Sequence, residues 1–296
     1  MKRTMAVVAA AALLLTGCGG DPLKGGGGGG GAAGGPIVIG SADFSESELL
    51  MHIYAGALTN AGVKVTTKPR VGSREVLVKA LQDKSLAVVP EYSGNLLQYF
   101  DKQNPAAQPD EVTAALKQKV PGGLEVLEKS AAEDSDALVV SKELAGQGVK
   151  SIADLGPKCS QYVLGAAGEW KDRWPAKLTQ LYGCTFKEIK TTDAAGPVTV
   201  EALKSGQVQV ANLFTTASAI TANGFVALQD PKRLYPAQNI LPLIRSEALD
   251  AKGKEALNKV SAALTTDKLI ALNKRIELDK ETVADVAKEF VTQNKL

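Results

Sequence analysis

Two successive series of short apolar strands and amphipathic helices constrain the fold of this 296-residue chain more than any other feature. In the first series, we expect strands at 37–39, 63–67 and 86–89, and helices at 46–60 and 73–83. This β-α-β-α-β order predicts a parallel sheet with right-handed crossovers. Ligands of such sheets bind outside the carboxyl ends of the strands, so the segments that follow each strand are the first candidates for a site.

A second series repeats the pattern. We expect its strands at 137–140, 162–165, 185–189 and 208–213, its helices at 151–155, 170–182 and 198–205, and a last strand at 240–244 before a helical C-terminal part. In this interpretation the chain crosses between the two units from the strand at 124–128 to that at 137–140, and again from the strand near 208–214 to that at 240–244. Two α/β domains joined in this way form a hinged cleft that closes around a small ligand. We place one domain at 37–133 with 240–296, and the other at 134–239.

The first 36 residues fit neither series and are expected to be an export leader and a tether. Lys2 and Arg3 precede an apolar run too short to span a bilayer, which is typical of a secretory signal peptide. The L-T-G-C sequence that ends at Cys18 resembles the lipobox of bacterial lipoproteins, which implies cleavage after residue 17 and acylation of Cys18. A plain signal peptide or a buried apolar strand is the alternative. Residues 18–36 include seven consecutive glycines and predict a flexible linker.

Charge and composition argue against several classes of function. The formal net charge of +2 equals the contribution of Lys2 and Arg3, so the rest of the chain has no basic surplus for nucleic acid. Three cysteines and one histidine are too few for a Cys/His zinc cluster, and a Ser-His-Asp enzyme would depend on His52 alone. We interpret His52 as structural and expect no cofactor or metal. No G-x-S-x-G motif is present, although a paired-carboxylate hydrolase stays open.

Cys159 and Cys184 are expected to form a disulfide. Each cysteine lies just before a strand, and a helix separates them. Adjacent parallel strands of a β-α-β unit begin at the same edge of the sheet, which brings the two cysteines within bonding range. An exported chain also meets an oxidising compartment. Two reduced, packed thiols are the alternative.

Several short motifs point to a known family. G-S-A-D-F-S-E at 40–46, P-E-Y-S-G-N at 90–95 and A-N-L-F-T-T at 211–216 occur in this order, with G-S-R at 72–74 and E-W-K-D-R at 169–173. They resemble motifs of the ProX- or OpuAC-like substrate-binding proteins of ABC importers for glycine betaine, carnitine and choline. The resemblance covers about residues 37 to 245. It implies a two-domain, type II periplasmic-binding-protein fold of the α/β class, with a hinge of two crossing strands.

The resemblance also implies a function. A monomer lipid-anchored to the outer face of the cytoplasmic membrane would capture an osmoprotectant in the interdomain cleft and deliver it to the membrane subunits of an importer. The family holds a quaternary ammonium in a box of aromatic rings, through cation–π attraction. Tyr92 matches one box position and Phe214 a second, whereas Asp136 and Gln238 replace the tyrosines at two more. The other candidate ligand-binding residues are Phe44, Ser47, Asn95, Arg173 and Asn239.

The replacement of two box tyrosines by Asp136 and Gln238 leaves the chemical class of the ligand open. Asp136 offers a negative partner for a cation, but an amide-rich pocket equally suits a polyol or a hydroxylated aromatic compound. Arg173 is interpreted either as a clamp for a carboxylate or as part of a surface ion pair. Other functions, an enzyme or an envelope sensor on the same scaffold, are less favoured alternatives.

Overall fold

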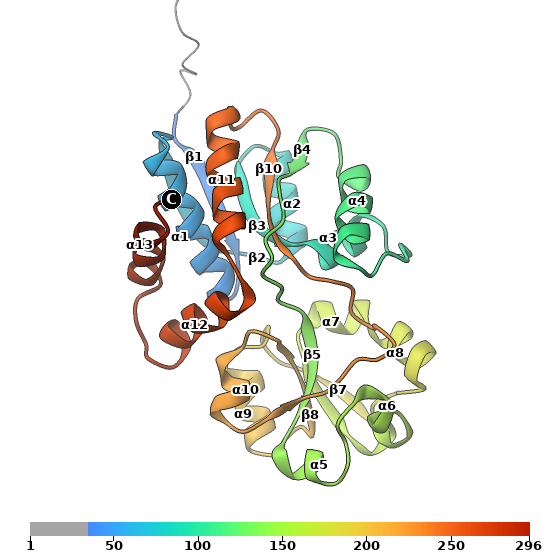
Figure 1. Cartoon of the computed structure of the whole chain (residues 1–296). Coiled ribbons are helices and arrows are strands. Elements are labelled where there is room, and N and C mark those ends of the chain that lie inside the picture. The colour runs from blue at the N-terminus through green and yellow to red at the C-terminus, as the bar shows by residue number, and fades with distance from the viewer. Residues whose placement is uncertain (1–34) are drawn as a thin grey trace, which may run out of the picture. The chain divides into compact units, whose positions relative to one another are not determined.

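The computed structural model describes residues 35–296, and Figure 1 gives their arrangement. The expected leader, Cys18 and nearly all of the glycine-rich linker lie outside the described residues. None of the helices within residues 35–296 is both long enough and apolar enough to cross a membrane.

The first sheet has five strands in the order β2-β1-β3-β10-β4. Its strands are β1 (Ile37–Ala42), β2 (Val65–Gly72), β3 (Val88–Tyr92), β4 (Leu124–Val126) and β10 (Ile240–Arg245). The helices that accompany it are α1 (Ser45–Asn60), α2 (Arg74–Gln82), α3 (Ser93–Phe100), α4 (Pro109–Lys119), α11 (Ala251–Ala263), α12 (Thr266–Glu277) and α13 (Val283–Gln293). We call this part lobe 1. Separate apolar clusters bury one face of the sheet under α1 and α11–α13, and the other face under α2–α4.

The second sheet repeats this arrangement in the order β7-β6-β8-β5-β9, and we call the part built on it lobe 2. Its strands are β5 (Asp136–Val140), β6 (Val163–Ala166), β7 (Glu188–Thr191), β8 (Val210–Phe214) and β9 (Val226–Ala227). Its helices are α5 (Lys142–Gly146), α6 (Ile152–Leu155), the 3₁₀ helix η1 (Gly156–Gln161), α7 (Gly168–Arg173), α8 (Pro175–Tyr182), α9 (Pro197–Lys204) and α10 (Ser218–Ala222).

The parallel pairing expected for the first series is confirmed, since β1 pairs parallel with β2 and β3. In the second series, β6 pairs parallel with β7 and β8, but β5 departs from the expected pattern. Strand β10 pairs antiparallel with both β3 and β4, and β5 pairs antiparallel with β8. The reason is connectivity, because β5 enters lobe 2 from lobe 1, and β10 returns from lobe 2 into lobe 1. Within a lobe, strands that are joined by helical crossovers run parallel to one another. A strand that enters the sheet directly from the other lobe runs in the opposite direction to them.

The two crossing segments, residues 127–135 and 228–239, pair with each other between the lobes. Asp134 N donates to the Gln238 carbonyl at 3.1 Å. Ser130 N of the first segment donates to the carbonyl of Ile240, the first residue of β10, at 2.8 Å. An antiparallel bridge joins Glu133 to Asn239. The fold is therefore the predicted two-domain α/β fold with a hinge of two crossing strands, and its domain limits at 133/134 and 239/240 stay a prediction.

Two helical regions differ from the expectation. The single helix expected at 170–182 is interrupted at Trp174, where α7 ends and α8 begins. Pro175 has no N–H to donate and is favoured as the first residue of a new helix, which explains the break. Helices α3 and α4 lie in a stretch for which no element was predicted.

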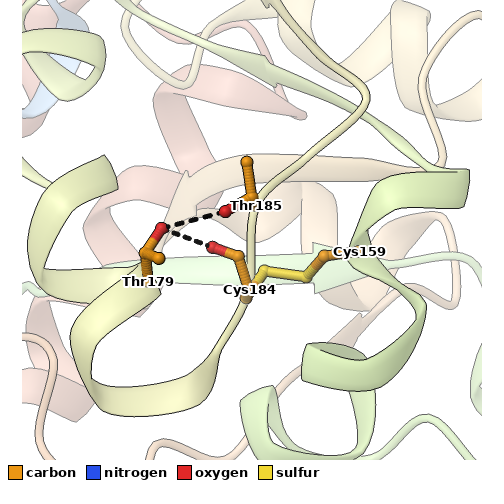
Figure 2. The surroundings of a disulfide bond; sticks show 4 residues. All are labelled: Cys159, Thr179, Cys184 and Thr185. Carbon is orange, nitrogen blue, oxygen red and sulfur yellow. Dashed lines mark hydrogen bonds between the residues drawn. A yellow bond between two sulfur atoms is a disulfide. The ribbon is translucent and has the colours of Figure 1, made fainter.

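The expected disulfide joins Cys159 in η1 to Cys184, which follows α8 (Figure 2). The two Cα atoms lie 5.3 Å apart, within the normal range for a disulfide. Both cysteines are buried in the lobe 2 core. The Thr179 hydroxyl donates to the Cys184 carbonyl at 3.0 Å, so the end of α8 is fixed beside the bond.

Replacing both cysteines by serine should lower the free energy of unfolding by about 3 kcal/mol, because the disulfide closes a loop in the unfolded chain. Urea denaturation of both proteins, with and without dithiothreitol, measures the effect. Reductant should destabilise the wild type and leave the Cys159→Ser/Cys184→Ser variant unchanged. Equal stability of the oxidised and reduced wild type would contradict the prediction.

Candidate functional site

A cavity of about 140 Å³ lies where lobe 1, lobe 2 and the first crossing segment meet. As expected, most of its wall lies at or just after the carboxyl ends of strands. The rest comes from α2, α3 and α7, from Asp134 in the first crossing segment and from Asp136 at the start of β5. Its lining residues are Ala42, Asp43, Phe44, Gly72, Ser73, Arg74, Glu75, Leu77, Pro90, Glu91, Tyr92, Asn95, Asp134, Asp136, Ala167, Glu169, Trp170, Arg173, Trp174, Ala194, Asn212 and Phe214. Among the described residues, no group of three or more His, Cys, Asp or Glu side chains is placed to hold a metal ion.

Three aromatic rings from the two lobes meet in this wall. Phe44 precedes α1, Tyr92 ends β3, and Phe214 ends β8 of lobe 2. The Phe44 centroid lies 5.9 Å from that of Tyr92 and 5.4 Å from that of Phe214, and both ring pairs are tilted. The structure therefore brings together all three aromatic residues predicted from the sequence as ligand-binding. Ring faces grouped in this way attract a cation.

Two tryptophans of lobe 2, Trp170 and Trp174, also line the cavity, although the sequence motifs did not predict them as ligand-binding residues. Trp170 donates through its indole N–H to the Tyr235 hydroxyl at 3.1 Å, and Trp174 packs edge-on against the Tyr235 ring at 5.0 Å. Their spacing in the sequence could have predicted them, since residues three and four apart lie on one face of a helix. Trp170, Arg173 and Trp174 follow this spacing.

The carboxylate of Asp136 is buried in the wall. Its two oxygens accept hydrogen bonds from Asn212 Nδ2 at 3.0 Å and from Asn95 Nδ2 at 3.2 Å. Burial raises the pKa of Asp136, while these two hydrogen bonds oppose that change. Because Asn95 belongs to lobe 1 and Asp136 to lobe 2, this contact also joins the lobes across the site.

Two arginines line the cavity in different states of pairing. Arg74 binds Glu91 through three N–O contacts of 2.8–3.0 Å, and both side chains are largely buried. Arg173 has no carboxylate oxygen within 4.0 Å among residues 35–296. Burial, followed by the nearby Arg74 charge, lowers the pKa of Arg173. A guanidinium stays protonated in proteins, so Arg173 presents a positive charge to the cavity.

A buried polar network lies behind the ring of Tyr92. The Tyr92 hydroxyl donates to Glu46 Oε1 at 2.7 Å. Glu46 Oε2 accepts hydrogen bonds from the Thr216 hydroxyl at 2.6 Å and from Asn273 Nδ2 at 2.5 Å. Asp134 accepts a hydrogen bond from Thr216 N at 3.1 Å. We call these five residues the Glu46 network.

Three other predicted residues lie outside the cavity wall. The Ser47 hydroxyl accepts a hydrogen bond from Ala42 N at 2.9 Å, which fixes the turn between β1 and α1. Gln238 is fully buried, and its side-chain oxygen accepts from Asn95 N at 2.9 Å. Asn239 donates to the Ser130 carbonyl at 3.1 Å, within the crossing segments. None of the three lines the cavity, because each is engaged by backbone next to the site, and their part in ligand binding stays a prediction.

Comparison with known proteins identifies relatives. A family model described as the substrate binding domain of ABC-type glycine betaine transport systems, OpuAC, matches residues 35–293. The glycine betaine-binding protein YehZ of Escherichia coli K12 is 25% identical over 275 residues, or 87% of this chain and 90% of that protein. A glycine-betaine-binding protein of Pseudomonas aeruginosa PAO1 is 26% identical over 278 residues, or 87% and 88%.

Solved structures have the same fold. A crystal structure of a glycine betaine/carnitine/choline ABC transporter aligns with a TM-score of 0.70 at 22% identity, covering 88% of this chain and 98% of that chain. Lactococcal OpuAC, in its closed conformation with glycine betaine, aligns with a TM-score of 0.62 at 15% identity, covering 88% and 96%. These likenesses confirm the predicted two-domain periplasmic-binding-protein fold.

The buried acid Asp134 should make stability fall as pH rises. Burial, and then the Glu46 charge, raise the pKa of Asp134 well above its usual range. The folded chain therefore keeps a proton that the unfolded chain releases above about pH 4. Relative to Asp134→Asn, a neutral side chain of the same shape, wild-type stability should decrease by about 1.4 kcal/mol per pH unit from about pH 4 up to the raised pKa.

Urea denaturation between about pH 4.5 and 7 measures this slope. Asp83→Asn is the matched control, because hydrogen bonds from Ser85 lower the pKa of that exposed carboxyl, which is then ionised in both states over this range. Its stability difference from the wild type should stay flat. A flat difference for Asp134→Asn as well would rule out a buried, protonated Asp134.

Proposed function

This chain belongs to the OpuAC family, the substrate-binding domains of ABC-type glycine betaine transport systems, and on that premise we propose that it captures a zwitterionic quaternary amine such as glycine betaine for an ABC importer. One observation carries the proposal. A single interlobe cavity combines aromatic ring faces, a buried carboxylate and a guanidinium, that of Arg173, without a carboxylate partner among residues 35–296. This combination matches the two opposite charges of a betaine.

The ammonium end of the ligand is assigned to the rings and Asp136. A trimethylammonium group has a permanent charge and no N–H to donate, so ring faces and a negative charge suit it better than hydrogen-bond acceptors. Phe44, Tyr92 and Phe214 offer ring faces, each contact contributing about 0.5–2 kcal/mol according to how far it is desolvated. Asp136 adds a negative charge in the same wall.

The carboxylate end is assigned to Arg173. A guanidinium binds a carboxylate through two parallel N–H···O bonds, and a partly buried site strengthens them. Arg74 is already bound to Glu91 and therefore has little capacity left for a ligand. Arg173 is the cavity arginine without a carboxylate partner among residues 35–296.

The alternatives have weaker support. The relatives that match this chain are named for glycine betaine binding, which gives no support to a polyol or a hydroxylated aromatic ligand. The family is one of transport substrate-binding proteins, so we propose a receptor without catalytic activity.

Substrate-binding proteins of ABC importers act outside the cytoplasm and deliver their ligand to the membrane subunits. For this chain we propose, in addition, a monomer with a leader at 1–17, acylation of Cys18 and a glycine-rich tether at 18–36. The L-T-G-C sequence and the glycine run support this proposal. Two or more acyl chains would give a stable anchor, whereas a single chain binds membranes reversibly.

Isothermal titration calorimetry with glycine betaine and choline tests the binding proposal. Arg173→Gln should weaken glycine betaine binding about 10- to 100-fold, because a charge-assisted pair with the carboxylate is lost. Choline has no carboxylate, and its affinity should change by less than about threefold. Lys171→Gln is the matched control, since Lys171 lies on the same helix and binds Thr191 at the surface.

Equal losses for both ligands in Arg173→Gln would contradict the assignment of the carboxylate to Arg173. Absence of binding or thermal stabilisation by any quaternary amine, in the wild type, would reject the proposed function itself.

Metabolic labelling with an alkyne fatty acid in a bacterial host tests the anchor. The wild-type chain should be labelled and partition into the detergent phase, and Cys18→Ala should do neither, since the acceptor thiol is gone. The Cys159→Ala/Cys184→Ala variant is the control and should keep its label. Labelling that survives in Cys18→Ala would rule out acylation at this residue.

A further inference from the structure

The Tyr92 side chain offers the cavity its ring but not its hydroxyl. Its hydroxyl is turned to the buried carboxylate of Glu46, at 2.7 Å. Tyr92 nevertheless lines the cavity, whereas Glu46 does not. Glu46 is thus one layer removed from any ligand and acts on it only through its neighbours.

The second oxygen of Glu46 reaches the other lobe. It accepts from the hydroxyl of Thr216, two residues after the cavity ring Phe214, at 2.6 Å. Ser218 N, slightly further along, donates to Glu277 of α12 at 3.0 Å. The segment that carries Phe214 is therefore fastened to lobe 1 at two points, and one of them is the carboxylate that also holds Tyr92.

The hydrogen bonds around Glu46 suit an ionised carboxylate. Tyr92, Thr216 and Asn273 all donate to it, and no cationic group lies within 4.0 Å among the described residues. Burial raises the pKa of Glu46, while these hydrogen bonds oppose the change. Burial and the Glu46 charge raise the pKa of Asp134 beside it, which favours the protonated form of Asp134. The pair then carries one negative charge, behind the Tyr92 ring.

We propose that Glu46 is a positioning residue that sets the preference of this cavity for a cation. A phenol that donates to a carboxylate has a more electron-rich ring, and the face of such a ring attracts a cation more strongly. The same carboxylate holds the Tyr92 and Phe214 sides of the cavity in one arrangement. This inference rests on the proposed function, because it concerns how that site distinguishes a quaternary ammonium from a neutral group.

A matched pair of ligands isolates the effect. Glycine betaine and tert-butylacetate share their shape and their carboxylate, but only the first has a charged nitrogen. The dissociation constant of tert-butylacetate divided by that of glycine betaine, both from isothermal titration calorimetry, measures the preference for the cation. Glu46→Gln and Tyr92→Phe should each reduce this ratio about 3- to 10-fold. In the double variant the reduction should be smaller than the product of the two single effects, because the Tyr92–Glu46 hydrogen bond is lost in both single variants.

Glu48→Gln is the control, since Glu48 lies in the same first turn of α1 but pairs with the half-exposed Arg70. Its ratio should equal that of the wild type. If Glu46→Gln weakens both ligands equally, Glu46 is only a structural residue and the inference is overturned. If Glu46→Gln does not fold, Tyr92→Phe keeps the test, and an unchanged ratio there overturns the inference too.

The outcomes separate this inference from the proposed function. A wild-type chain that binds neither ligand rejects the proposed function. A wild-type chain that binds glycine betaine, with variants that keep its preference over tert-butylacetate, rejects only the role of Glu46.

Discussion

The antiparallel pairing of the two crossing segments determines how the rest of the molecule is arranged. Each lobe is a sheet whose parallel strands end at the same edge, and ligands of such sheets bind at that edge. Hydrogen bonds such as Asp134 N to the Gln238 carbonyl hold the crossings side by side. With the crossings fixed, carboxyl ends of strands from both sheets border one cavity, and β5 and β10 must run against their neighbours.

Within the cavity, paired and unpaired charges have different consequences. Arg74 and Glu91 neutralise each other where both are buried, and removing either partner would leave an uncompensated charge. Arg173 has lost part of its hydration without gaining a carboxylate partner among the described residues. Such a group gains from an anion that arrives with a ligand, whereas Arg74 would first have to give up Glu91.

The sequence alone allowed prediction of features set by local pattern and by strand order. The alternation of strands and helices led to the two-domain fold, the positions of Cys159 and Cys184 led to the disulfide, and the motifs led to Tyr92 and Phe214. The direction of β10 was missed because it depends on the lobe from which the strand enters. Side-chain partners across the chain were missed for the same kind of reason. Gln238 is engaged by a backbone N–H of α3, more than a hundred residues away in the sequence.

The aromatic residues of this site were only partly predicted from the sequence. Tyrosines are absent at two expected positions, yet Trp170 and Trp174 line the wall from α7 and the residue after it. Their position in the wall depends on the break between α7 and α8 before Pro175. The spacing of the motifs does not predict this break.

The disulfide has a consequence for the order in which an exported chain can fold. Lobe 2 is continuous in sequence, and both cysteines of the bond lie inside it. Lobe 1 is discontinuous, because β10 and helices α11–α13 come from the end of the chain. A chain that emerges from a membrane with its N-terminus first therefore presents all of lobe 2 before lobe 1 can be completed. The Cys159–Cys184 disulfide can then form in lobe 2 before β10 completes the sheet of lobe 1.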